Sequence, residues 1–311
     1  MSAIVRSIRK WVARQNFRAR RSLIGRIPVK NIERLANVGW LMRSWCDVRW
    51  RATGVSRAEL GRDLLGLPAE IAQRARAGIL LEKLIDQRIY FGRAIRNGES
   101  LPDLDAVAQT LADEVRRLKS IAPGKPIFVS PFHYVSQYAN IYVVEKMGAL
   151  LGIDSLAVVS GVPQNQYGDD HALIPGIKVL YTYNDPNRGG LGVRVARALK
   201  RHGVAVLFSD VPPYTMHRYP METVGVSMFG RNARIHNGVF RMGATFDALL
   251  LPFYLRFEQG RFKVRLFDPI RLADEGAPQR LAGDIEAALS ENYPQWLTSG
   301  HPAMYSFAAA K

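Results

Sequence analysis

The sequence predicts an α/β fold, a mixed central sheet layered by helices, with a helical and strongly basic region ahead of it. Two observations predict this fold. Before about residue 98 the apolar residues recur at helical spacing, and after about residue 120 short apolar runs of strand length alternate with helical segments. Such alternation is typical of a sheet whose faces are covered by helices. We therefore divide the chain into a basic helical region, residues 1–98, and an α/β domain, residues 99–311.

The first 32 residues carry nine basic side chains and no carboxylate, because the first acid is Glu33. At about 100° per residue, five apolar residues share one side of a helix and most of the basic residues fill the other, with Phe17 falling on the basic side. This pattern fits a helix that lies among lipid headgroups. It also fits a helix that docks its apolar side on the protein. The apolar residues are Ile4, Val5, Ile8, Trp11 and Val12.

Helical spacing continues from Asn31 to Gly98 and is punctuated by Pro68. This region is rich in tryptophan and arginine, which could lie near a membrane, although helix packing explains them equally well. A further helix is predicted over Leu104–Leu118. The tryptophans and arginines in question are Trp40, Trp45, Trp50, Arg43, Arg49 and Arg51.

The remaining elements follow from short apolar runs and from glycine and proline signals. A helix over Leu191–His202 should end at Gly203, and a hairpin should turn at Glu258-Gln-Gly-Arg261. An amphipathic stretch runs to Leu151, and a last helix covers Pro278–Asn292. The predicted strands are Pro126–Ser130, Leu156–Ser160, Ile177–Thr182, Val204–Phe208, Leu249–Phe257 and Phe262–Phe267.

Composition restricts the function classes. The chain has 43 Lys and Arg against 27 Asp and Glu, a formal net charge of +16, which predicts attraction to polyanions such as anionic lipid, nucleic acid or acidic carrier proteins. Its single cysteine, Cys46, excludes an intramolecular disulfide and any cysteine-rich metal cluster. No apolar run approaches the ~20 residues of a membrane-spanning helix. Motifs of nucleotide-driven enzymes, zinc proteases and nucleophile-elbow hydrolases are absent.

The residue that most strongly indicates chemistry is His133, in Phe128-Val-Ser-Pro-Phe-His133. It follows a predicted buried strand and precedes a helix, which is where α/β sheets place their sites. An imidazole there could take a proton from a hydroxyl or amine that attacks an activated acyl group, and a partner on its other nitrogen would orient it. A purely structural histidine is the alternative.

The order of further segments resembles the late lipid A acyltransferase family of the lauroyl and myristoyl type, within the lysophospholipid acyltransferase-like superfamily. The resemblance covers about residues 120–272, is strongest over Gly203–Arg256, and is echoed at Tyr293-Pro-Gln-Trp296. Its segments are Gly189-Gly-Leu-Gly-Val-Arg-Val-Ala-Arg-Ala-Leu-Lys200, Gly203-Val-Ala-Val-Leu-Phe-Ser-Asp210, Val224-Gly-Val-Ser-Met-Phe-Gly230, Gly243-Ala-Thr, Leu250-Leu-Pro-Phe-Tyr-Leu-Arg256 and Phe267-Asp-Pro-Ile-Arg271.

The resemblance implies an acyltransferase-like fold and transfer of an acyl group from an acyl-carrier-protein or coenzyme A thioester. The acceptor would be a lipid or another hydroxyl or amine compound. It places the protein in the cytoplasm, peripherally on the inner face of the cell membrane, with an anionic membrane surface as partner. No cofactor and no nucleic acid are expected.

The family signature is a histidine, four residues, then Asp or Glu. Here His133 is followed at the sixth position by Tyr138, so the acid is absent. Tyr138, or the strand-end Asp210 that the resemblance also matches, could position the imidazole, and Ser136 and Gln137 are possible neutral substitutes. A second departure is Ser299-Gly-His-Pro-Ala-Met-Tyr305, where the family tends to carry a His-Arg-Arg-Phe-like segment.

Further candidates for substrate binding follow the Phe-Gly pair or precede a helix. Arg231, Arg234, His236 and Asn237 lie where the family approaches its donor or acceptor, although a solvated basic loop is the plainer interpretation. Arg188, just before Gly189, could bind an anion at a helix N-terminus. Asp169-Asp170-His171 is interpreted as a polar loop, so no metal site is predicted.

Two functions are favoured: a membrane-associated acyltransferase with His133 as general base, or a catalytically altered or non-catalytic descendant that binds a lipid or a carrier protein. A third hypothesis, nucleic-acid binding through the basic N-terminal residues, is the weakest, because no recognised binding module accompanies the charge.

Overall fold

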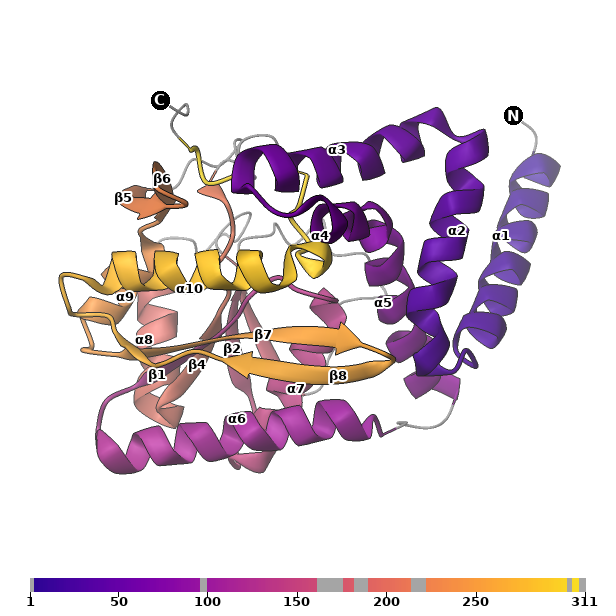
Figure 1. Cartoon of the computed structure of the whole chain (residues 1–311). Helices are drawn as coiled ribbons and strands as arrows, with labels where there is room; N and C mark the ends of the chain where they lie inside the picture. The colour runs from indigo at the N-terminus through magenta and orange to yellow at the C-terminus, as the bar shows by residue number, and fades with distance from the viewer. Residues whose placement is uncertain are drawn as a thin grey trace.

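The computed structural model describes residues 3–95, 100–160, 176–181, 190–213, 222–300 and 304–307 (Figure 1). Within these residues the chain forms a seven-stranded, mostly parallel sheet and a separate two-stranded hairpin. The sheet order is β3-β2-β4-β1-β7-β8, with β9 also paired to β7. The predicted α/β class with a mixed central sheet is therefore confirmed.

The strands of the central sheet occur where the apolar runs predicted them, except for the short β9, which was not predicted. They are β1 (Ile127–Pro131), β2 (Leu156–Ser160), β3 (Ile177–Tyr181), β4 (Val204–Leu207), β7 (Leu249–Glu258), β8 (Arg261–Leu266) and β9 (Ile270–Arg271). β1 and β2 are buried along their whole length, as expected for parallel strands covered on both faces. β7 pairs parallel with β1 and antiparallel with β8, which forms the predicted hairpin.

Helices cover both sides of this sheet. In Figure 1, β7 and β8 run between α10 (Ala277–Asn292) and α6 (Pro102–Ile121). α7 (Gln137–Leu150) packs on α6, and α8 (Leu191–His202) packs on β2, β3 and β4. α8 ends at Gly203 as predicted, because that glycine adopts the left-handed conformation with φ 69°. The apolar positions of α6 that the sequence pattern selected are buried: Leu104, Val107, Leu111, Val115 and Leu118.

The N-terminal region is helical, and its divisions depend on local caps. α1 (Ala3–Ile24) and a short turn, η1 (Val29–Asn31), precede α2 (Ile32–Cys46), α3 (Val48–Leu65), α4 (Ala69–Arg74), η2 (Ala75–Ala77) and α5 (Gly78–Ile95). Asp47 starts α3 by accepting a hydrogen bond from the backbone N–H of Trp50 at 3.0 Å. Phe17, the residue that breaks the amphipathic pattern of α1, makes an edge-to-face contact with Phe91 of α5, so it anchors α1 to the molecule.

A hairpin and the helix that follows it were also not predicted. β5 (Thr223–Met228) and β6 (Arg231–His236) form an antiparallel hairpin, and α9 (Gly238–Ala244) follows it. The hairpin turns at Phe229 and Gly230, which have φ angles of 50° and 67°, so both central residues take the positive φ of a tight two-residue turn. The sequence signal was weak because Phe229 is an unusual residue for that conformation.

One apolar core joins the two regions of the chain. Buried residues of α2 and α5, such as Ile32 and Ile85, belong to the same cluster as the strand residues Phe128 and Leu250. The N-terminal helices therefore share the core that supports the sheet. Among the described helices, none combines the length and the apolar composition needed to cross a bilayer.

The packing of α9 gives a test of the fold. A Cβ at Gly243 would lie 2.7 Å from the Cβ of Leu272 and closer still to its Cδ1, so Gly243→Ala forces Leu272 to move. We expect it to lower the free energy of unfolding by about 1–3 kcal/mol, as overpacking does. The matched control is Gly283→Ala on the exposed side of α10, where nothing lies within 4 Å. It should raise stability by about 0.5–1 kcal/mol. Urea denaturation would measure both, and equal effects would contradict the packing.

Candidate active site

The site lies at the carboxyl ends of two neighbouring strands. β1 and β4 pair in parallel, with Phe128 opposite Ala205 and Val129 opposite Val206. His133 follows the end of β1 and Asp210 follows the end of β4, so the parallel register brings the two residues to the same edge of the sheet. Ser130 and Ser209, whose hydroxyl oxygens are 2.6 Å apart, link the two strand ends just behind them.

Asp210 binds His133 through both carboxylate oxygens. Oδ1 lies 2.7 Å from the imidazole Nδ1, and Oδ2 accepts the backbone N–H of His133 at 2.7 Å. The Asp210 side chain is 1% exposed and the His133 side chain is 14% exposed. The ring of Phe208 covers one side of the imidazole, with ring centroids 4.5 Å apart.

This geometry selects one form of the imidazole. The ionised carboxylate only accepts hydrogen bonds, so Nδ1 must carry the proton that it shares with Oδ1. The neutral ring then has its lone pair on Nε2, which is the arrangement of a general base oriented by a carboxylate. The structure therefore provides an acid partner although the sequence lacks one at the signature position.

The Asp210 carboxylate is held by more than the histidine. Trp296 donates its indole N–H to Oδ2 at 3.2 Å, and the Tyr305 hydroxyl donates to the backbone carbonyl of Asp210. Both aromatic side chains are fully buried and their rings stack. A buried carboxylate needs such donors because desolvation penalises its charge. The C-terminal segment therefore completes the site.

The loop that carries His133 is fixed from two sides. Val135, with φ 67°, donates its N–H to the Gln295 carbonyl at 2.8 Å, and Leu297 donates its N–H to the His133 carbonyl at 2.8 Å. On the other side, the amide of buried Asn140 donates to the carbonyls of residues 134 and 136 at 3.1 and 3.0 Å. The imidazole is thus placed by a rigid backbone.

A buried arginine connects this site to the N-terminal helices. Arg57 of α3 is 4% exposed and donates to the carbonyls of Ala75, Trp296 and Ser299, at 3.1, 3.2 and 3.0 Å. Burial lowers the pKa of its guanidinium from the ordinary value. Arg57 therefore holds the segment that presents Trp296 to Asp210.

The residues after His133 have structural partners on α5. Ser136 caps α7 by accepting the Ala139 N–H at 2.9 Å, and its hydroxyl donates to Asp86. The ring of Tyr138 packs edge-on against Tyr90. Burial raises the pKa of the Tyr138 phenol, an effect that Arg93 opposes. Of the two positioning groups proposed from the sequence, the geometry therefore favours Asp210 over Tyr138. Gln137 is half-buried in the first turn of α7.

A second acid faces the site from α5. Burial and, to a smaller extent, the nearby Asp86 raise the pKa of Glu82, attraction to Arg57 and His133 opposes them, and the resulting pKa is about 7. Glu82 is thus close enough to feel the charge of the imidazole. Nothing in its sequence surroundings indicated this, because only helix packing brings α5 beside the loop that carries His133.

The other predicted binding residues lie on or next to the β5–β6 hairpin. Arg231 donates to the Leu64 carbonyl at 3.5 Å, and Arg234 donates to the Thr223 hydroxyl at 2.7 Å. Burial lowers the pKa of His236, and Asn237 precedes α9. The hairpin meets the site indirectly, since the Arg234 N–H donates to the carbonyl of Tyr305. Arg188 and the Asp169-Asp170-His171 cluster lie outside the described residues.

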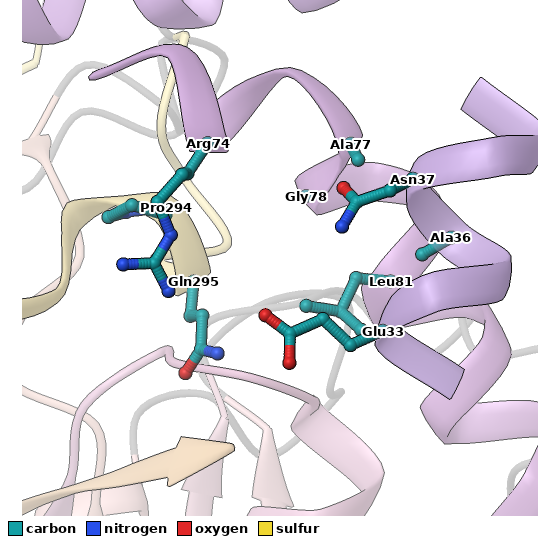
Figure 2. A pocket seen from close by; sticks show the side chains of 9 residues that line it. All are labelled: Glu33, Ala36, Asn37, Arg74, Ala77, Gly78, Leu81, Pro294 and Gln295. Carbon is teal, nitrogen blue, oxygen red and sulfur yellow. The ribbon is translucent and has the colours of Figure 1, made fainter. Parts of the chain in front are cut away.

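A small pocket lies between α2, α4, η2, α5 and the turn η7 (Tyr293–Gln295) (Figure 2). Glu33, Arg74 and Gln295 point into it. Its volume of about 40 Å³ suits a water molecule or two rather than a substrate chain. Over the described residues, no group of three or more His, Cys, Asp or Glu side chains lies close enough to hold a metal ion.

The sequence did not indicate the residues that support His133 and Asp210. Trp296 was noted only because Tyr293-Pro-Gln-Trp296 resembles a family segment. Tyr305 was noted only because Ser299–Tyr305 differs from the segment that the family carries near its C-terminus. Asn140, Arg57 and Glu82 carried no signal, although a buried-helix position occupied by Asn or Arg is in itself a reason to look for a partner.

No protein-family model matches the chain, and no curated protein matches it closely enough to transfer a function. The function must therefore be argued from the site.

Glu82 gives a pH-dependent test of the site. Its folded-state pKa of about 7 lies above the ordinary value of 4.5, so its contribution to stability is present below pH 4.5 and is lost as pH rises through 7. Glu82→Gln removes that loss. In urea denaturation, the free energy of unfolding of the variant minus that of the wild type should increase by about 2 kcal/mol as the pH rises from 5 to 8. Glu275→Gln is the control, because Glu275 is exposed in a turn and its replacement removes no buried carboxyl group. A pH-independent difference for Glu82→Gln would contradict the assigned burial.

Proposed function

We propose that this protein is an acyltransferase that moves an acyl group from an acyl-carrier-protein or coenzyme A thioester to a hydroxyl or amine acceptor, with His133 as general base. The observation that carries the proposal is the 2.7 Å contact between Nδ1 of His133 and Oδ1 of Asp210 at the carboxyl edge of the sheet. The resemblance to late lipid A acyltransferases supports the thioester donor, the lipid class of acceptor and a peripheral place on the inner face of the cytoplasmic membrane.

With its proton on Nδ1, the His133 ring has a free lone pair on Nε2, and this lone pair starts the proposed reaction. Nε2 of His133 takes the proton of the acceptor hydroxyl or amine as its oxygen or nitrogen attacks the thioester carbonyl. A C–O or C–N bond forms, and the carbonyl becomes a tetrahedral oxyanion. When it collapses, the C–S bond breaks and the imidazolium returns its proton to the leaving thiolate. Asp210 stabilises the imidazolium throughout and keeps its own charge.

The position of the carboxylate distinguishes this site from the family signature. In the signature the acid lies five residues after the histidine, where this chain has Tyr138. Here the carboxylate comes from the end of β4 and also accepts a hydrogen bond from the backbone N–H of His133. The proposal is thus a base whose acid partner is supplied by a neighbouring strand.

The net charge is consistent with the proposed partners. A charge of +16 attracts both an acidic carrier protein and anionic lipid, and it accelerates encounter with either. The alternative, a binding protein built on the same fold, keeps these partners but needs no base.

The first test is His133→Ala. Purified protein is incubated with acyl-carrier-protein and coenzyme A thioesters and with hydroxyl and amine lipids, and thiol release and acylated product are followed. We expect the variant to lose about 10²–10⁴-fold in rate, the usual contribution of a general base. Unchanged activity would overturn the site. Wild-type protein that binds the thioester carrier but releases no thiol would favour the binding protein.

Asp210→Asn tests the partner more sharply. The two donors at Oδ2, the His133 N–H and the Trp296 indole, require an oxygen there, so the new amide nitrogen must face Nδ1. That nitrogen donates to Nδ1 and moves the imidazole proton to Nε2, which then cannot act as a base. We expect a loss of about 10²-fold or more with the fold retained. Tyr138→Phe is the control and should keep activity within about twofold of the wild type, because it preserves the ring contact with Tyr90.

A further inference from the structure

The outer side of α2 and the start of α3 expose an unusual run of large apolar side chains. Trp45 is 81% exposed, and Val48 and Met42 are 68% and 67% exposed. At helical spacing the residues of α2 fall on one side, opposite the buried Ile32 and Ala36. We call this set the α2–α3 face; it consists of Leu35, Val38, Leu41, Met42, Trp45 and Val48.

The neighbouring tryptophans show that this exposure is specific. Trp40 and Trp50 are half-buried, and each lies against an arginine: the guanidinium of Arg76 is 6.0 Å from the Trp40 ring, and that of Arg43 is 4.1 Å from the Trp50 ring. Trp45, between them in sequence, extends from the surface instead. Large apolar residues gathered on one exposed surface mark an interaction site.

Charge indicates what covers the face. Between residues 34 and 51 the chain has four arginines and one carboxylate, Asp47. That carboxylate is already engaged by Arg43, at 3.3 Å, and by the Trp50 N–H. Arg34, Arg49 and Arg51 are exposed on the same two helices. The face is therefore apolar and flanked by positive charge.

We propose that the α2–α3 face binds the surface of an anionic lipid bilayer, with Trp45 and its apolar neighbours among the acyl chains and the arginines at the phosphates. Apolar side chains with a tryptophan, flanked by arginine, are the composition of a helix that lies in the headgroup layer. A second copy fits less well, because a two-fold interface would place the same arginines opposite one another.

The α2–α3 face is connected to the site through α3. α3 begins in the face and, nine residues after Val48, carries Arg57, which holds Trp296 and Ser299. In Figure 1, α1 is the outermost helix on this side of the molecule, α2 lies next to it, and α3 follows α2 directly in the chain. The inference rests on the proposed function only in giving the enzyme a lipid acceptor. Vesicle binding is measured without acyl transfer, so each can fail while the other holds.

The single cysteine provides the probe. Cys46 is exposed, lies next to Trp45 and is the only cysteine in the chain. An environment-sensitive fluorophore on Cys46 should shift to the blue and brighten when phosphatidylcholine vesicles with about one-third phosphatidylglycerol are added. A spin label in the acyl chains should quench it. Pure phosphatidylcholine vesicles, or high salt, should weaken the response several-fold, because screening removes the attraction of the arginines.

Substitutions test the same surface without the label. Trp45→Glu, and Met42→Glu combined with it, should lower the affinity for the anionic vesicles in co-sedimentation by about tenfold or more. Both side chains are exposed, so the fold should be retained, and thermal unfolding checks this. Val193→Glu on α8 is the matched control: Val193 is 58% exposed on another surface, and its variant should bind as the wild type does.

Three results would overturn the inference. One is the absence of vesicle binding by the intact protein. Another is binding without any change at Cys46 or in Trp45→Glu, which would assign the membrane contact to another surface such as α1. The third is self-association, or binding of an acidic carrier protein, that Trp45→Glu abolishes while vesicle binding persists.

Discussion

The buried carboxylate of Asp210 accepts hydrogen bonds from three groups that the chain contributes at two distant places: the backbone and the imidazole of His133, and the indole of Trp296. A charge with 1% exposure is costly unless such donors replace the lost water. The same bonds that satisfy it also hold the histidine loop, the end of β4 and the C-terminal segment together. Removing the carboxylate side chain, or any one donor, therefore disturbs both the local packing and the state of the imidazole.

The strand-end residue Asp210 supplies a carboxylate at Nδ1 of His133, although the sixth position counted from the histidine is Tyr138. The strand-end position has an added consequence. Asp210 fixes the backbone of His133 as well as its side chain, whereas Ser136 and Asp86 are left to cap α7 and join it to α5.

The N-terminal helices are part of this construction. Arg57 spans from α3 to the carbonyls of Trp296 and Ser299, and Glu82 and Asp86 bring carboxyl groups from α5 to the back of the histidine loop. The helices that present the α2–α3 face thus also buttress the site. The exposed apolar side chains of the α2–α3 face and the residues that hold the dyad are therefore carried by one set of packed helices.

The sequence by itself determined the α/β class, the central strands and the approximate limits of α6, α8 and α10, because period, apolar runs and residues such as Gly203 act locally. It also selected His133 and Asp210 as strand-end residues. Tertiary structure alone decided that they meet: they are 77 positions apart, and only the parallel register of β1 and β4 brings them to 2.7 Å. It likewise decided that Tyr138 packs on Tyr90 and that Trp45 is exposed while Trp40 and Trp50 are not. Helical spacing gives each residue a direction around its helix, but the neighbour in that direction is set by packing between distant segments.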